Sequence, residues 1–269
     1  MIDRHAVLER DGVTVSAVAC RHGAGRGEAP EPSPRRSIVF VRRGCFVRSA
    51  DGIEALLDPT VAYCTNPGEE QRYDHPQEHG DDCTVIAFDE ASADRLWGDA
   101  PLPSGPLYTT PAVDLAHRLL LAAGRRRQGA HELYERAITL AADALGAREP
   151  ARIAAGRPST DRARRRLVDD AREALAAAPE RSLPELAEHL SVSPHHLSRM
   201  FRSRTGHTVS RYRLLLRARD GLERIAGGEG HLARLAVELG FADQSHLTRV
   251  VRMLTGRTPA TLRAALAGD

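Results

Sequence analysis

Two sets of hydrogen-bonding side chains recur 50 residues apart near the C-terminus of this 269-residue chain. Arginine, histidine, serine and glutamine side chains can hydrogen-bond to the edges of bases and to phosphates. The first set is His195, His196, Ser198, Arg199 and Arg202, and the second is Gln244, Ser245, His246, Thr248, Arg249 and Arg252. These residue types, repeated at one spacing, have the chemistry needed to read double-stranded DNA.

Each polar set lies on a segment whose apolar residues have helical spacing. Leu197, Met200 and Phe201 follow one another at i, i+3 and i+4. This spacing puts them on one stripe of a helix and leaves the polar set on the other side. Further apolar stripes around Leu186 and Leu235 predict a preceding helix in each copy. The pattern is that of two helix-turn-helix motifs.

The residues that begin and end helices agree with this interpretation. Ser182 and Glu185 have the spacing of a capping box, and Ser193 is suited to begin the next helix. Glycine tolerates a positive φ, which favours it in turns and at the ends of helices. The glycines in such places are Gly206, Gly240 and Gly256.

Residues from about 160 to 266 resemble the DNA-binding domain of the AraC/XylS family of bacterial transcription regulators. The most specific part of the resemblance is residues 240–249 followed by residues 255–259. The resemblance implies seven helices, with two helix-turn-helix subdomains joined by a central helix over residues 209–225. The family often has phenylalanine, tyrosine or alanine at positions where this chain has Leu247, Val251, Leu262 and Gly221. The glycine costs about 1 kcal/mol of helix propensity.

The same resemblance assigns roles to the two polar sets. It implies that His195, Ser198 and Arg199 contact bases from one reading helix. It places Gln244, Ser245 and Arg249 in the same role on the other. Arg202 and Arg252 are predicted to contact phosphates.

Charge is divided unevenly along the chain, although the total is only +2. Residues 160–269 hold 19 arginines and 13 acidic residues, a net charge of +6, and residues 1–159 carry −4. The chain has no lysine, so its basic contacts depend on the planar fork of arginine, which suits phosphate and guanine. The basic C-terminal part is suited to a polyanionic partner.

The N-terminal third has the alternation of short β-strands. They are predicted at residues 13–21, 37–43, 45–49, 53–57, 61–65 and 84–88. Asp51-Gly52 indicates a two-residue hairpin, and residues 24–36 are predicted to form a loop. The region resembles the cupin-like sensory domain that often precedes an AraC-type domain. The predicted fold class is therefore α+β: a cupin-like β-barrel, a helical connector and an all-α double helix-turn-helix domain.

Two helices are predicted between these regions, at residues 113–123 and 132–145, with a linker at residues 147–161. Their apolar stripes could pair two subunits or pack on the chain's own barrel, and the sequence leaves both alternatives open. The predicted domains are residues 1–110 for sensing, 111–160 for connection and dimerisation, and 161–269 for DNA binding.

The signal that such a sensory domain would receive is open. Cys20, Cys45 and Cys83 are candidate redox or effector residues, predicted at strand ends or beside turns, and buried structural thiols are the alternative. His75, His79 and Cys83 have the four-residue spacing of metal ligands, but Pro76 and Gly80 favour a loop, so no metal site and no cofactor is predicted.

Catalysis is the rival class of function. A cupin-type enzyme or a metal-dependent repair protein fused to a DNA-binding domain is the alternative considered. The cysteines lack the close pairs of a four-thiolate zinc site, and no nucleophile elbow or phosphate-binding loop is present. No catalytic residue is therefore predicted, and the chain is expected to be a regulator.

The expected partners follow from this interpretation. They are double-stranded operator DNA, RNA polymerase, an unidentified small-molecule or redox effector, and a second copy of the chain. No apolar run reaches the roughly 20 residues of a membrane span, and residues 1–5 do not begin a signal peptide. We expect a cytoplasmic protein with no membrane partner.

Overall fold

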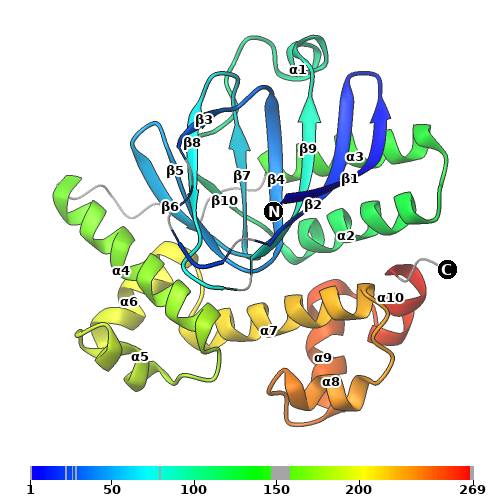
Figure 1. The fold of residues 1–269 in the computed structure, drawn as a ribbon. Helices are drawn as coiled ribbons and strands as arrows, with labels where there is room; N and C mark the ends of the chain where they lie inside the picture. Colours follow the sequence, from blue (N-terminus) through cyan, green and yellow to red (C-terminus); the bar gives the residue numbers. More distant parts are fainter. Residues whose placement is uncertain are drawn as a thin grey trace. The chain divides into compact units, whose positions relative to one another are not determined.

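The computed structural model describes residues 2–21, 23–25, 27, 29–78, 80–146 and 158–266. By internal packing the chain divides into two compact units, one of residues 1–147 with 218–269 and one of residues 148–217. The predicted α+β class is confirmed, because antiparallel sheets are followed by helices (Figure 1). Among the described residues, no helix combines the length and the apolar character that crossing a membrane requires.

Two antiparallel sheets make up the N-terminal part of the first unit. The six-stranded sheet has the order β1-β2-β9-β4-β7-β10, formed by Ile2–Arg10, Val13–Cys20, Asp81–Phe88, Arg36–Arg43, Val61–Thr65 and Pro106–Tyr108. The four-stranded sheet has the order β3-β8-β5-β6, formed by Glu31–Pro32, Glu70–Asp74, Phe46–Ala50 and Ile53–Leu57. Asp51 and Gly52 both have positive φ in the β5–β6 turn, which confirms the predicted hairpin.

Strand β4 shows how the sheets and helices share one core. Ile38 and Phe40 are buried in the cluster that includes residues of α2 (Pro111–Arg125) and α3 (Ala130–Gly146). Val39 and Val41, which point to the opposite face, are buried in a cluster with Phe46 of the other sheet. Figure 1 shows α2 and α3 lying beside the strands. The apolar stripes of these two helices therefore pack on the chain's own sheet.

Several sequence expectations need correction. Strands β1, β8 and β10 and the helix α1 (Glu90–Trp97) were not predicted. The short strand β3 lies inside the predicted loop of residues 24–36, and Cys83 lies within β9 instead of at a strand end. Most of the predicted linker lies outside the described residues, but α4 (Pro158–Ala177) begins within it.

The remaining helices are α5 (Leu183–His189), α6 (Pro194–Thr205) and α7 (Val209–Ala226), then α8 (Leu232–Glu238), α9 (Gln244–Thr255) and α10 (Pro259–Leu266). Helix α7 confirms the predicted central helix and continues through Gly221. A Cβ at this position would lie 3.1 Å from Leu239 Cδ1. The glycine therefore makes room for close packing of the second helix-turn-helix motif.

Candidate nucleic-acid interface

The first helix-turn-helix motif consists of α5 and α6. Ser182 and Glu185 form a complete capping box before α5. The Ser193 hydroxyl accepts a hydrogen bond of 3.2 Å from the His196 backbone N–H, which fixes the start of α6. Gly206 ends the helix in the left-handed conformation. The predicted caps are thus confirmed, and they set the first residue of the polar face.

The second motif consists of α8 and α9. Gly240 has a φ of +71° in the turn and Gly256 ends α9 in the left-handed conformation, as predicted. Asp243 accepts a hydrogen bond of 2.7 Å from the His246 backbone N–H and so begins α9. The first motif uses Ser191, at a φ of +53°, in its own turn. A serine thus adopts there a conformation that usually favours glycine.

Side chains of α6 and α9 that are 50 residues apart in sequence are exposed or buried in the same pattern. Leu197 and Leu247 are fully buried in their motifs. The exposed members of the predicted sets are His195, Arg199 and Arg202 on α6 and Gln244, Ser245, Arg249 and Arg252 on α9; His196, Ser198, His246 and Thr248 are half-buried. Each helix therefore presents a polar face that contains two exposed arginines. Base contact by these residues remains a prediction.

His246 makes contacts that sequence reasoning did not anticipate. Its ring meets Phe241 edge to face, with centroids 5.3 Å apart. Its Nδ1 lies 3.4 Å from the Ala242 backbone nitrogen and accepts a hydrogen bond from it. Both contacts hold the turn against the start of α9. His246 thus helps to position helix α9.

A buried network of charges lies within the first unit, where α2 and β4 meet the C-terminal half of α7. Glu223 of α7 pairs with Arg118 of α2, and its other oxygen lies 2.6 Å from Nη1 of Arg42 on β4. Asp114 of α2 lies 3.4 Å from Arg118 and 3.6 Å from Nε of Arg219 on α7. Opposite charges are thus paired where they are removed from water.

The pairing fixes the charge state of both carboxylates. Burial alone would raise the pKa of Asp114, but Arg118 and Arg219 outweigh it and lower that pKa. Burial would likewise raise the pKa of Glu223, and Arg118 and Arg42 lower it instead. Both groups are therefore ionised at neutral pH. Glu223 is 105 residues from Arg118 and 181 residues from Arg42 in sequence, so periodicity gave no signal of these pairs.

The thiols of the sensory region are buried. Cys20, Cys45, Cys64 and Cys83 are all buried. Burial raises the pKa of the Cys64 thiol to about 12. Burial and the neighbouring Asp81 raise the pKa of Cys83 well above its usual value. Because the thiolate is the reactive form, these two residues are poor oxidant sensors. The redox prediction then rests on Cys20 and Cys45.

The structure combines metal-ligating residues differently from the spacing considered in the sequence. His79 lies outside the described residues. His75 lies beside Cys20 and Asp81, and the Cys83 thiol donates a hydrogen bond of 3.2 Å to Asp81. Sequence reasoning singled out Cys20, His75 and Cys83 but missed Asp81. No local pattern links it to a cysteine 61 residues before it.

Comparisons with known proteins were made for the sequence and for the fold. Residues 186–265 match a family model described as a helix-turn-helix domain. No curated protein matches the chain.

Similar solved structures fall into two kinds. One is ToxT from Vibrio cholerae O395, with 10% identity over 97% of this chain and 100% of that chain, and a TM-score of 0.38. An AraC-type regulator from Chromobacterium violaceum has 22% identity over 40% of this chain and 96% of that chain, with a TM-score of 0.37. A Cupin 2 conserved barrel domain protein from Salinispora arenicola CNS-205 has 13% identity over 35% of this chain and 81% of that chain, with a TM-score of 0.29. Residues 186–265 therefore form a helix-turn-helix domain.

Proposed function

We propose that this protein binds a specific double-stranded DNA sequence through the exposed faces of α6 and α9 and regulates transcription from it. The observation that carries the proposal is that α6 and α9 expose side chains at matching positions, 50 residues apart, so that both helices have a similar polar face. An arginine on such a face can bind the O6 and N7 atoms of guanine with two hydrogen bonds. The proposal assigns no catalytic reaction to the chain.

The sheets of residues 1–110 are proposed to receive the signal, a small molecule or a redox change. Within the first unit, the pairs from Arg118 and Arg42 to Glu223 connect α2 and β4 with α7. A change in sheet packing would therefore alter contacts made by the helix that precedes the second motif. Residues 111–160 would act as connector, and RNA polymerase and a second copy of the chain are further proposed partners.

The phosphate-binding part of the proposal predicts a change in salt dependence. Arg202→Ala and Arg252→Ala should each make the slope of log affinity against log salt concentration shallower by about one. The reason is that a protein with one phosphate contact fewer releases about one counterion fewer when it binds DNA. Affinity should fall by a similar factor on every DNA sequence, and fluorescence anisotropy at several salt concentrations measures both quantities.

A matched control is available on α3. Arg136 is exposed and pairs with Glu132 of the same helix, so Arg136→Ala removes the same charge from a helix that belongs to neither proposed motif. Its slope should equal that of the unaltered protein. Unchanged slopes for both Arg202→Ala and Arg252→Ala would show that neither arginine binds phosphate.

A further inference from the structure

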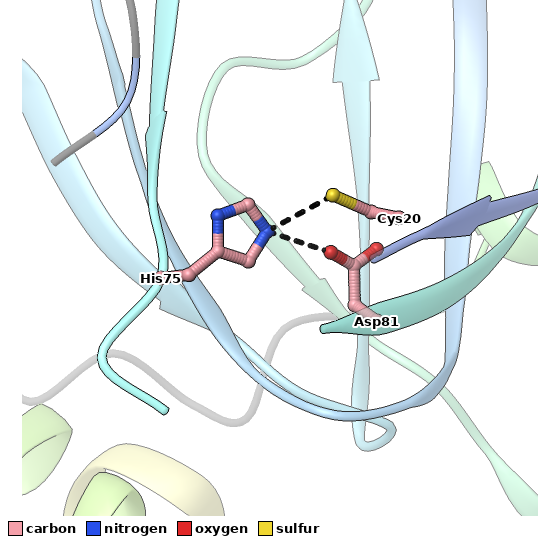
Figure 2. Close-up of side chains that lie close together, drawn as sticks. All are labelled: Cys20, His75 and Asp81. Carbon is pink, nitrogen blue, oxygen red and sulfur yellow. Dashed lines mark hydrogen bonds and ion pairs between the residues drawn. The ribbon is translucent and has the colours of Figure 1, made fainter. Parts of the chain in front are cut away.

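Three side chains with metal-binding atoms converge where strand β2 ends, between β8 and β9. Nε2 of His75 lies 3.5 Å from Cys20 Sγ and 2.8 Å from Asp81 Oδ1. The three candidate ligand atoms all lie within 4.8 Å of one another. Figure 2 shows the side chains pointing toward one another, with His75 Nε2 facing both partners. The cluster thus has a common centre.

The backbone fixes each member of the cluster. Cys20 and Asp81 are directly opposite each other in the antiparallel pairing of β2 with β9, so their side chains lie on the same face. The backbone of His75 exchanges two hydrogen bonds of 2.9 Å with Gly25. Gly80 has a φ of +63°, and a Cβ there would lie only 2.1 Å from the Cys20 carbonyl oxygen. Only glycine allows the turn before β9 to pass so close to Cys20.

The cluster is also removed from solvent. Cys20, His75 and Asp81 are exposed by only 7%, 8% and 6%. A buried carboxylate is costly unless a positive charge lies beside it. A bound divalent cation would supply that charge for both the carboxylate and the deprotonated thiol.

We propose that Cys20, His75 and Asp81 bind one zinc ion. A thiolate sulfur, an imidazole nitrogen and a carboxylate oxygen form a donor set that zinc accepts, with bond lengths of about 2.0–2.3 Å. Tetrahedral bonds of that length place ligand atoms roughly 3.3–3.8 Å apart. The distance of 3.5 Å between Cys20 Sγ and His75 Nε2 lies within that range, and the 2.8 Å between His75 Nε2 and Asp81 Oδ1 would have to lengthen to admit the ion.

Three protein ligands leave one coordination position for water or for an incoming small molecule. Cys83 donates its hydrogen bond to the second carboxylate oxygen of Asp81, Oδ2, which directs Oδ1 toward His75. On binding, the Cys20 thiol loses its proton to solvent, the Cys20 sulfur bonds to zinc, and His75 binds in its neutral form. One proton is therefore released for each zinc bound.

The test is a zinc titration of the full-length protein after a chelator has removed its metals, with a chromophoric chelator as competitor. We expect one zinc per chain, release of one proton, and a higher melting temperature with zinc. Cys20→Ala and His75→Ala should each weaken zinc binding by at least about 100-fold, since loss of a supporting partner alone costs 10- to 100-fold. With cobalt(II) in place of zinc, Cys20→Ala should lose the sulfur-to-metal charge-transfer band.

Cys64→Ala is the matched control, because it makes the same change at a buried thiol outside the cluster. It should bind zinc as the unaltered protein does. Circular dichroism checks that each variant is folded. Absence of stoichiometric zinc in the folded, unaltered protein would overturn the proposal, as would equal affinities for Cys20→Ala and Cys64→Ala. The titration uses no DNA, so either result leaves the proposed function untouched.

Discussion

Replacing Glu223 by alanine is expected to lower the free energy of unfolding by about 3–5 kcal/mol. Glu223 contacts both Arg118 and Arg42, and the Arg118 side chain is only 1% exposed. Without the carboxylate, both guanidinium groups would remain away from water with too little negative charge beside them. An unpaired buried charge costs far more than a lost surface contact.

Urea unfolding followed by circular dichroism measures this loss. Glu132→Ala is the matched control, because Glu132 pairs with Arg136 on the surface of α3 with more than half of its side chain exposed. Such pairs contribute between 0 and about 1 kcal/mol. Equal losses for the two variants would show that the buried network does not stabilise the fold.

The same network should lose its contribution in acid. The pKa of Glu223 is raised by burial but lowered more strongly by Arg118 and Arg42, so its net shift is downward. A carboxylate with a lowered folded-state pKa stabilises the protein above its unfolded-state pKa of about 4.3. That contribution disappears as the pH falls through the folded-state value. The difference in stability between the unaltered protein and Glu223→Gln should therefore shrink below about pH 4.

Replacing Arg249 by alanine is expected to weaken binding to the preferred DNA by about 1–3 kcal/mol and to relax the preference at one or two base pairs. Arg249 is exposed on α9, two residues beyond the buried Leu247. If it binds a guanine edge with two hydrogen bonds, its loss removes the discrimination at that base pair while other positions keep theirs.

Sequencing of DNA selected by each variant measures the preference position by position. Arg252→Ala serves as the comparison, since it removes the same charge from the same helix at a position assigned to phosphate. It should weaken binding without changing the selected sequence. An unchanged preference for Arg249→Ala would remove this residue from the base-contacting set.

Local chemistry carried the successful sequence predictions. Ser182 with Glu185 predicted a capping box, Ser193 an N-cap, and Gly206 and Gly256 left-handed ends, and each forms as predicted. These features depend on a few adjacent residues, so a single sequence shows them. Strand β4 also shows a local signal, because its central residues Ile38 to Val41 are all apolar and are buried on both faces.

Features that depend on contacts between distant residues could not be predicted from the sequence. Strand β8 is polar and only half-buried, so it lacks the alternation by which strands are recognised. Its pairing with β5 is decided by the rest of the sheet. Asp81 acquires its role only because β9 pairs with β2 and brings it opposite Cys20. In the sequence, Glu223 looks like an ordinary surface residue of an amphipathic helix. Its pairing with Arg118 is visible only in the structure, where α2 packs beside α7. Both sites depend on long-range pairing, which one sequence does not display.

Selection of bound DNA from a random pool, followed by footprinting of the selected sequence, tests the central claim most directly. Two working reading helices should contact major-groove segments about one helical turn apart, roughly 34 Å, and one chain should protect an asymmetric site of about 20 base pairs. Arg199→Ala and Arg249→Ala should relax opposite halves of that site. A pool with no enriched sequence, or one short protected segment that only one of these variants alters, would contradict two sequence-reading helices in this chain.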